Sequence, residues 1–510
     1  MKKANRHYLN IIKVIVVALT LFIQISVIYL FFVLFTEIGA YSYFIIELIG
    51  VLIALRVLGS NKKYIYKLSW TVFLVIIPVS AIVFYLLYGN QRFIKKIRSV
   101  EDQIGTDLSF GNQQNDHIVD QLENKRLKTD INSIYNLSKY PVYQSSENKY
   151  FKLGEEFFED VIEKLENAEK FILIEFYIIA RGELYERITD ILIDKVKSGV
   201  EVYMIYDKLG SLRTFGKDEV QHLTDNGIKI VAFNKDITKI YRFVSYRTHR
   251  KIIIVDGKYT YTGGNNLADE YINIGSKYGH WKDMGIRVQG PAANSFIYAF
   301  FKSWVLLTQS SVDIKKYVQE QLPYSGIEDN IVVPFTDEPT NDLEIASHNY
   351  MRIIANSTDY VYITTPYLII DEEMISSLKL AAKSGVDVRI ILPGIADKKF
   401  IYEVSMAHCL DLILAGVKVY RYNPGFIHGK TIVSDDYYST VGSVNFDYRS
   451  LMWNYECAIY AYDSNLAKQI REDFEGELKL STCINEQYLK DRTLSRKILN
   501  GIFRLIGPLF

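Results

Sequence analysis

One pattern of residues occurs twice in this chain, and its two copies constrain the possible fold more than any other feature. The first copy contains His249, Lys251, Asp256, Gly263 and Asn266, and the second contains His428, Lys430, Asp435, Gly442 and Asn445. The histidine precedes its lysine by two residues and its aspartate by seven in both copies. Two copies with the same spacing predict two related domains in one chain.

The order of predicted elements repeats together with the pattern. Strand-like and helix-like runs alternate at 171–179, 183–197 and 200–206, and again at 360–365, 372–383 and 386–392. Alternation of this kind is typical of α/β folds. We therefore predict duplicated α/β domains with mixed sheets at 145–325 and 326–488, with a site at their interface.

The first 90 residues are much more apolar than the rest. Residues 14–35 and 68–88 carry no charge, and each stretch is long enough to span a bilayer. Residues 38–58 are a weaker candidate because they contain Glu47 and Arg56. We expect a multi-pass anchor of two or three transmembrane helices in the cell membrane at 1–90, and its orientation stays open.

Two further segments lie outside the duplicated region. Residues 91–144 are polar and poorly periodic, which favours a linker with a first helix. Residues 489–510 mix basic and apolar side chains at helical spacing. This C-terminal segment could lie on an anionic membrane surface or pack on the body of the protein.

Composition excludes several classes of protein. Fifty-nine basic residues balance fifty-nine acidic ones, so a protein that coats nucleic acid is not expected. The three cysteines form no CxxC pair or Cys/His cluster, so we expect no zinc site. The oligomeric state is not indicated.

The residue types in the repeated pattern indicate phosphate chemistry. Histidine and lysine two positions apart on a strand project from the same face. Two lysines and two asparagines that meet in one cleft can donate to phosphate oxygens, while one imidazole attacks phosphorus and the other protonates the leaving alkoxide. Such a site supplies positive charge without a metal or cofactor.

This paired pattern resembles that of the phospholipase D superfamily, and more narrowly of bacterial cardiolipin synthases. The narrower resemblance depends on the apolar N-terminal region and on the short sequence motifs Glu175-Phe-Tyr177, Trp281-Lys-Asp283 and Asn445-Phe-Asp-Tyr-Arg-Ser450. The resemblance implies transfer of a phosphatidyl group between two phosphatidylglycerol molecules, the donor and the acceptor, through a phosphatidyl-histidine.

The resemblance also implies roles for individual residues. His249 would be the nucleophile and His428 the general acid and then base, although the order could be reversed. Asp283 and Glu456, each downstream of a motif, would orient the histidines. The remaining implied site residues are the catalytic-motif members Lys251, Lys430, Asp256 and Asp435 and the phosphate ligands Asn266, Asn445 and Ser443. Of these, we expect Asp256 and Asp435 to hold local structure.

Several alternatives stay open at this point. Water and an alcohol compete for the same phosphohistidine, so a phospholipase D or a nuclease shares the motif. Neutral charge and the apolar N-terminus disfavour a nuclease. Arg250 and Lys258 flank the predicted site and are expected to be solvated charges. Tyr177 and Tyr367 end matching strands, where they could line a lipid entrance or pack locally.

Overall fold

The computed structural model describes residues 37–60, 64–86, 92–109, 113–145, 147–234, 246–275, 277–320, 324–341, 343–485 and 487, with four positions between 22 and 29. The predicted amphipathic segment 489–510 lies outside the described residues. The same holds for the predicted span 14–35, apart from those four positions.

The first domain is built on a seven-stranded mixed sheet. Every residue of the apolar strand FILIEF is buried, as expected for a central strand covered on both faces. Its neighbours on one side run parallel to it, and the neighbour on the other side runs antiparallel. The strand order is β2 (Glu147–Phe151), β10 (Gly285–Gln289), β8 (Tyr259–Gly263), β7 (Lys251–Val255), β3 (Phe171–Phe176), β4 (Glu201–Asp207) and β5 (Lys229–Phe233).

The second domain repeats this arrangement in a larger sheet. Its parallel strands are again flanked by an antiparallel hairpin that follows the motif histidine. The strand order is β1 (Tyr143–Gln144), β11 (Ile331–Asp337), β20 (Asn454–Tyr462), β18 (Tyr438–Gly442), β17 (Thr431–Ser434), β12 (Tyr360–Thr364), β14 (Asp387–Pro393), β15 (Lys418–Tyr422) and β21 (Ser481–Ile484). The predicted duplication into two α/β domains is confirmed.

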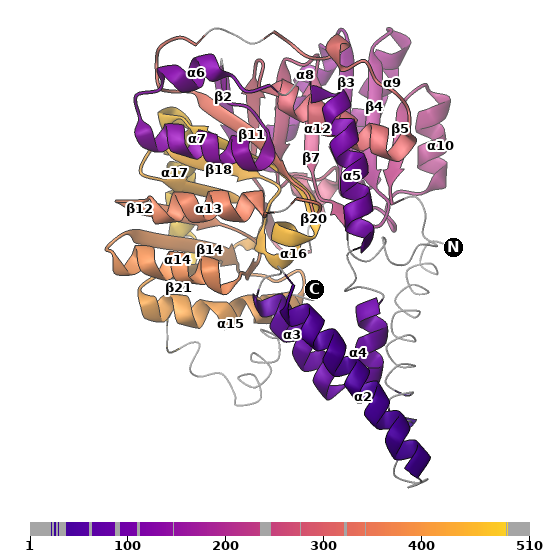
Figure 1. Ribbon diagram of the computed structural model, residues 1–510. Coiled ribbons are helices and arrows are strands. Elements are labelled where there is room, and N and C mark those ends of the chain that lie inside the picture. The colour runs from indigo at the N-terminus through magenta and orange to yellow at the C-terminus, as the bar shows by residue number, and fades with distance from the viewer. Residues whose placement is uncertain are drawn as a thin grey trace.

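Helices cover both faces of the sheets (Figure 1). Alternate side chains of β3 enter different cores: Ile172 and Ile174 pack with the outer helices, and Leu173 packs into a core shared by both domains. Two helices occupy this shared core and contact strands of both sheets. These are α12 (Ala293–Thr308) and α17 (Ser464–Lys479), and the outer helices include α8 (Gly154–Glu166), α9 (Glu183–Lys197), α10 (Lys217–Asp225), α13 (Ile345–Ala355), α14 (Glu372–Lys383) and α15 (Lys399–Ala415).

Two short parallel strand pairs join the domains next to the repeated motif. β6 (Arg247–Thr248) pairs with the start of β20, and β9 (His280–Lys282) pairs with β16 (Gly425–Ile427). His249 directly follows β6, and Glu456 directly follows the paired residues of β20. In the other pair, Asp283 directly follows β9 and His428 directly follows β16. This pairing fixes both residues to a common backbone frame.

The described residues between 92 and 144 are an integral part of the body. They form α5 (Arg92–Asp107), α6 (Asp116–Gln121) and α7 (Lys125–Ser138) in the described part of the chain. Leu127, Ile131 and Ile134 of α7 are buried in a core of the second domain. The sequence suggested a linker and one helix here, because short helices with many polar residues give a weak periodic signal.

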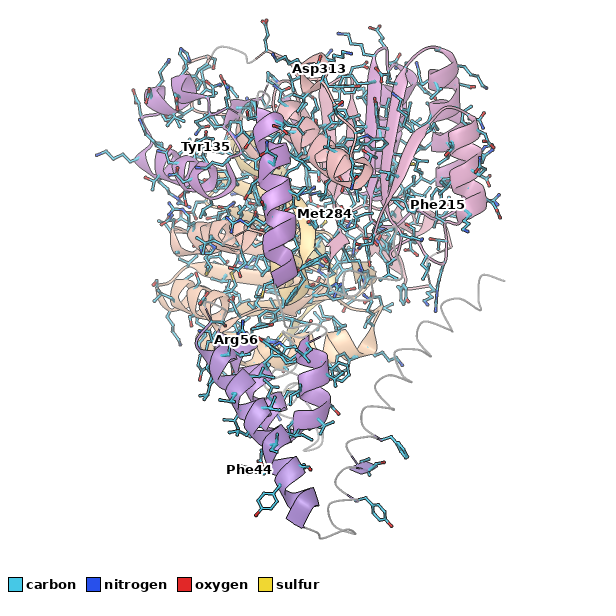
Figure 2. All side chains as sticks on the ribbon, turned by 45° about the vertical axis from the view of Figure 1, so that its right-hand side comes forward. Phe44, Arg56, Tyr135, Phe215, Met284 and Asp313 are labelled. Carbon is cyan, nitrogen blue, oxygen red and sulfur yellow. The ribbon has the colours of Figure 1, made fainter. Side chains whose placement is uncertain are left out.

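The apolar N-terminal helices project from one end of the body (Figure 1). Residues Tyr41–Leu58 of α2 (Glu37–Leu58) are long and apolar enough to cross a bilayer, which suggests membrane association. Phe44 lies near the distal end of α2 and Arg56 near the body (Figure 2). Pro78 divides the predicted span 68–88 into α3 (Tyr64–Ile76) and α4 (Pro78–Phe84).

Candidate active site

His249 lies between β6 and β7 and is held at two points by the second domain. Its backbone N–H donates to the carbonyl of Tyr455 at 2.8 Å. Its side-chain Nδ1 lies 2.9 Å from both carboxylate oxygens of Glu456. With Nδ1 bonded to the carboxylate, Nε2 is the nitrogen left for chemistry.

His428 lies between β16 and β17 and has the same surroundings with the domains exchanged. Its backbone N–H donates to the carbonyl of Lys282 at 2.7 Å, and its Nδ1 lies 2.6 Å from Asp283 Oδ2. Both histidines are 8% exposed, and both carboxylates are fully buried. Each histidine therefore depends on a carboxylate from the other domain, which position along the sequence does not reveal.

Burial favours the neutral form of both imidazoles in the free enzyme. Burial lowers the pKa of His249 to about 4; Glu456 opposes this effect, and Lys251 and Lys430 add to it. Burial and Lys430 lower the pKa of His428 to about 3, against the opposing effect of Asp283. A neutral imidazole has the free electron pair that a nucleophile needs.

The two motif lysines are also perturbed, and each affects groups of the other domain. Burial lowers the pKa of Lys251 to about 7, and the charge on Lys430 acts in the same direction. Burial lowers the pKa of Lys430 to about 8. Lys251 Nζ donates to the His249 carbonyl at 2.6 Å, and Lys430 makes the equivalent bond to His428. An anionic phosphate between these lysines would favour their charged forms.

The two carboxylates that bond the histidines, Glu456 and Asp283, differ in the number of further hydrogen bonds that they accept. Glu456 accepts hydrogen bonds from Ser443 Oγ at 2.5 Å and from Asn454 Nδ2 at 3.0 Å. Asp283 accepts one from the backbone N–H of Met284 at 2.8 Å. Ser443 was predicted as a phosphate ligand, and the structure directs its hydroxyl to Glu456. Asn454 was not predicted, although its position two residues before Glu456 on one strand places both on the same face.

The residue that corresponds to Ser443 in the first motif is Gly264. A Cβ atom at Gly264 would lie 2.0 Å from Asp283 Oδ1, so only glycine fits beside this carboxylate. The preceding glycines, Gly263 and Gly442, are also confined, because a Cβ would lie 2.4 Å from the backbone carbonyl of Met284 or Cys457. These close approaches explain the glycine positions of both motifs.

The two predicted phosphate-binding asparagines differ in their surroundings. Asn266 is almost fully engaged: its Nδ2 donates to Tyr271 Oη at 2.5 Å, and its Oδ1 accepts from the Ile178 N–H at 3.1 Å. Burial raises the pKa of Asp447, and the neighbouring Asn445 side chain opposes this effect. Both asparagines are buried, and the hydrogen bonds of Asn266 fix the end of β3.

Asp256 and Asp435 are not brought to the histidines. The Asp256 carboxylate accepts from the backbone N–H groups of Glu169, Lys170 and Phe171 at 2.7–3.0 Å. Asp435 makes the equivalent bonds at the start of β12. Asp256 follows the end of β7 opposite to Lys251, roughly 16 Å away along a strand. Both aspartates therefore fix the sheet at the end remote from the site.

Aromatic side chains surround the histidines. The Tyr177 ring lies 5.0 Å from the His249 ring, edge to face. Trp281 and Phe426 lie 5.5 and 5.7 Å from the His428 ring. Tyr367 donates its hydroxyl to Asp397 at 2.7 Å and lies beside Phe426 rather than on a histidine. These rings exclude water from the imidazoles and contribute to their low pKa.

Arg250 is not the solvated charge that the sequence suggested. Its guanidinium is fully buried and donates to Glu338 Oε1 at 2.8 Å and to Ser303 Oγ at 3.0 Å. The prediction failed because an arginine between two motif residues carries no periodic signal of burial. Lys258, by contrast, is exposed, as expected.

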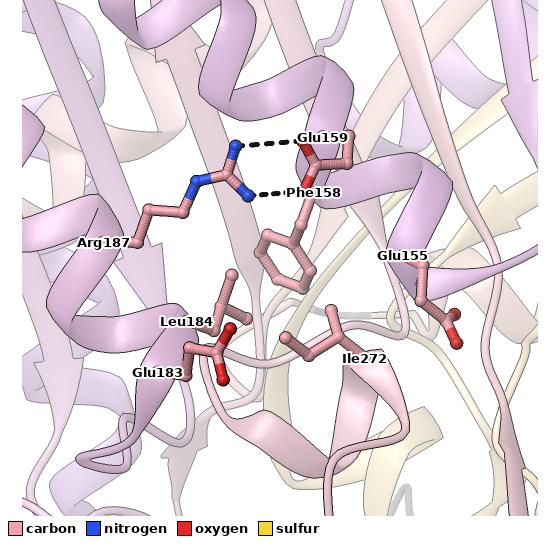
Figure 3. Close-up of a pocket in the computed structure, with 7 residues that line it drawn as sticks. All are labelled: Glu155, Phe158, Glu159, Glu183, Leu184, Arg187 and Ile272. Atoms are coloured by element: carbon pink, nitrogen blue, oxygen red, sulfur yellow. Dashed lines mark hydrogen bonds and ion pairs between the residues drawn. The ribbon is translucent and has the colours of Figure 1, made fainter.

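Figure 3 shows a surface pocket between α8, α9 and the 3-10 helix η3 (Asp269–Ile272), and none of the residues that line it belongs to the motif. Its polar side chains are three glutamates and Arg187, which is paired with Glu159 at 2.5 and 3.0 Å. An anionic lipid headgroup would meet mainly carboxylates there, so this pocket does not compete with the motif site.

Comparison with known proteins shows the family to which the chain belongs. A family model described as "Cardiolipin synthase, PLD-like domain" matches residues 161–303 and 350–478. A cardiolipin synthase of a Geobacillus species is 30% identical over 90% of this chain and 92% of its own length. Cardiolipin synthase 1 of Staphylococcus epidermidis is 32% identical over 86% of this chain and 91% of its own length.

Two other matches give less information on activity. A Streptococcus mutans protein described only as uncharacterized is 34% identical over 89% of this chain and 99% of its own length. The crystal structure of phosphatidylserine synthase from Haemophilus influenzae aligns with a TM-score of 0.57 at 14% identity, covering 76% of this chain and all of that one. This structural likeness concerns the fold alone.

Proposed function

The chain belongs to the cardiolipin synthase family of the phospholipase D superfamily, and from this premise we propose that it joins two phosphatidylglycerols into cardiolipin and glycerol through a phosphatidyl-histidine. The observation that carries the proposal is the crosswise pairing of His249 with Glu456 and of His428 with Asp283. Two imidazoles oriented by carboxylates and accompanied by two lysines suit attack on a phosphodiester without further groups.

In the first step, His249 Nε2 attacks the phosphorus of the donor phosphatidylglycerol. A P–N bond forms, the P–O bond to glycerol breaks, and protonated His428 gives its proton to the departing glycerol oxygen. The negative charge of the bound phosphate favours the protonated form of His428, which burial disfavours in the free enzyme. Asp283 stabilises the imidazolium through Nδ1, as carboxylates do in other histidine-dependent sites.

In the second step, the primary hydroxyl of the acceptor glycerol headgroup attacks the same phosphorus. His428, now neutral, takes the hydroxyl proton, the P–N bond breaks, and His249 returns to its neutral form. Lys251 and Lys430 stabilise the charge on the phosphate oxygens in both steps. The protons balance over the cycle, so no co-reactant is needed.

We propose further that α2 crosses the cell membrane, with α3 and α4 completing a multi-pass anchor. The support is the exposed apolar surface of α2, which includes Phe44, Leu52 and Leu55. The anchor also packs on the body close to the site, because Trp453, which precedes Asn454, contacts Tyr66 of α3 with a ring separation of 6.3 Å. Substrate dissolved in the bilayer would therefore reach the enzyme beside its catalytic domains.

A lipid assay tests the proposed reaction. The full-length protein in detergent is supplied with labelled phosphatidylglycerol, and the products are separated. Cardiolipin and glycerol in equal amounts are expected, and both His249→Ala and His428→Ala should abolish them. Phosphatidic acid and glycerol would instead identify a hydrolase, and cardiolipin formation by both variants would refute the assignment of the site.

A further inference from the structure

Glu101 of α5 is a buried carboxylate that the proposed reaction does not use. It is 2% exposed and accepts two hydrogen bonds from the second domain. Its Oε1 lies 2.5 Å from Tyr455 Oη, and its Oε2 lies 2.5 Å from Thr340 Oγ1. A buried carboxylate is costly unless it is fully hydrogen-bonded, so these contacts account for its presence.

Tyr455 connects Glu101 to the active site. The hydroxyl of Tyr455 meets Glu101, and its backbone carbonyl accepts the N–H of His249 at 2.8 Å. The next residue, Glu456, holds Nδ1 of the same histidine. The Tyr455 ring is enclosed by Phe233 at 5.2 Å and by the Arg250 guanidinium at 5.3 Å. Movement of this ring would therefore displace the backbone that fixes His249.

A second set of charged side chains lies beside Glu101 and includes Arg250, the residue that follows His249. Arg250, directly after His249, is paired with Glu338, and Lys302 donates to the other oxygen of Glu338 at 2.7 Å. Burial, followed by repulsion from Glu338, raises the pKa of Glu101 to about 7. The cluster thus joins α5 and α12 to β20 and to Arg250, the residue directly before β7, in one buried network.

Glu101 lies on the helix that follows the apolar N-terminal region. α5 is the next described helix along the chain after α4 of the apolar N-terminal region, and it lies along α12 (Figure 1). Among the charged side chains of α5 whose burial is described, Glu101 is the one enclosed in the core. Its contacts therefore connect the helix that follows the anchor to β20, the strand whose residues hydrogen-bond the catalytic His249.

We propose that Glu101 is a positioning residue for His249, acting through Tyr455 so that the helix following the membrane anchor helps to set the geometry of the active site. The inference rests on the proposed function only in that His249 takes part in phosphodiester chemistry. Positioning residues of this kind change turnover by about 10- to 100-fold when they are removed. Substrate affinity should change little, because Lys251 and Lys430 keep their places.

The test compares Glu101→Ala, Glu101→Gln, Tyr455→Phe and the double variant Glu101→Ala/Tyr455→Phe in the full-length protein. Asp130→Ala is the matched control: Asp130 is also a buried acid of the N-terminal segment, and it accepts from Tyr460 of the same strand β20 at 3.0 Å. The backbone of Tyr460 pairs with β11 and β18, not with a histidine. The readouts are kcat and KM for cardiolipin formation, 4-nitrophenol release from bis(4-nitrophenyl) phosphate, and the thermal unfolding midpoint.

We expect Glu101→Ala to lower kcat about 10- to 100-fold with KM within about twofold of the parent. Glu101→Gln, which keeps an acceptor oxygen, should recover part of the loss, and the double variant should be no slower than Glu101→Ala. Asp130→Ala should lower the unfolding midpoint and leave kcat within about twofold. Unchanged kcat in Glu101→Ala, or equal losses in Glu101→Ala and Asp130→Ala, would overturn the proposal.

The test also covers a variant that does not fold and a parent protein that forms no cardiolipin. If Glu101→Ala does not fold, Glu101→Gln and Tyr455→Phe decide, since reduced kcat in both supports the proposal and parental kcat in both refutes it. If the parent protein cleaves bis(4-nitrophenyl) phosphate but forms no cardiolipin, the proposed function fails, and the role of Glu101 is judged on nitrophenol release alone.

Discussion

Replacement of Gly264 by alanine tests whether the active site depends on an exact seat for the Asp283 carboxylate. The new Cβ would lie 2.0 Å from Asp283 Oδ1 and 2.8 Å from its Cγ, whereas ordinary contact begins at 3.4 Å. The carboxylate would have to retreat by about 1.4 Å. It has no free space for this, because Asp283 is fully buried and bonded to His428 and to the Met284 N–H.

The expected magnitude follows from this displacement. A shift of about 1 Å at a catalytic group costs roughly 100-fold in rate, and loss of an orienting contact costs about 10- to 100-fold. We therefore expect Gly264→Ala to lower kcat by about 10- to 100-fold. KM should stay within about twofold, because Lys251 and Lys430 are on other strands and keep their positions.

The assay is the initial rate of cardiolipin formation by full-length protein in detergent, with the thermal unfolding midpoint measured in parallel. Gly476→Ala is the matched control, since it makes the same substitution on α17 at a position with nothing within 4 Å of the new Cβ. It should leave kcat unchanged. A Gly264→Ala protein with the parental kcat and an unaltered unfolding midpoint would refute the idea that Asp283 must occupy this position.

Three further predictions follow from the same site. As pH rises through about 7 to 8, Lys251 and Lys430 lose their charge in the free enzyme, so kcat/KM should fall there; a pH profile that is constant up to pH 9 would contradict this. Asp283→Asn and Glu456→Gln, although in different domains, should each lower kcat by at least about 100-fold by allowing the wrong imidazole tautomer, and steady-state rates near the parental value in either variant would disprove the crosswise arrangement. Asp435→Ala removes the acceptor for three backbone N–H groups remote from the site, so calorimetry should show a lower unfolding midpoint with KM unchanged, and a large rise in KM would mean that Asp435 contacts the substrate.

Much of the fold could be predicted from sequence because local hydrophobic periodicity and the internal repeat both indicate its helices and strands. The helices predicted at 183–197 and 372–383 have the same bounds as α9 and α14. The strands predicted at 200–206 and 386–392 match β4 and β14 to within about one residue. Buried parallel strands give continuous apolar runs that are easy to identify.

The site could be predicted only in part. The motif identified both histidines and both lysines, and the carboxylates Asp283 and Glu456 were chosen by their positions downstream. Their exchange between domains was hidden, because pairing of β6 with β20 and of β9 with β16 is a long-range feature of two- and three-residue strands. Arg250 and Glu101 were missed for a related reason: charged residues predict exposure, and only tertiary partners such as Glu338 and Tyr455 explain their burial.

The most direct test of the account is to trap the covalent intermediate. Full-length protein is mixed with phosphatidylglycerol labelled in its phosphate, quenched in alkaline denaturant within one turnover, digested and examined by mass spectrometry. The account predicts one labelled phosphatidyl adduct, on His249, which disappears in His249→Ala. Turnover without any adduct, or an adduct on His428 in place of His249, would contradict it.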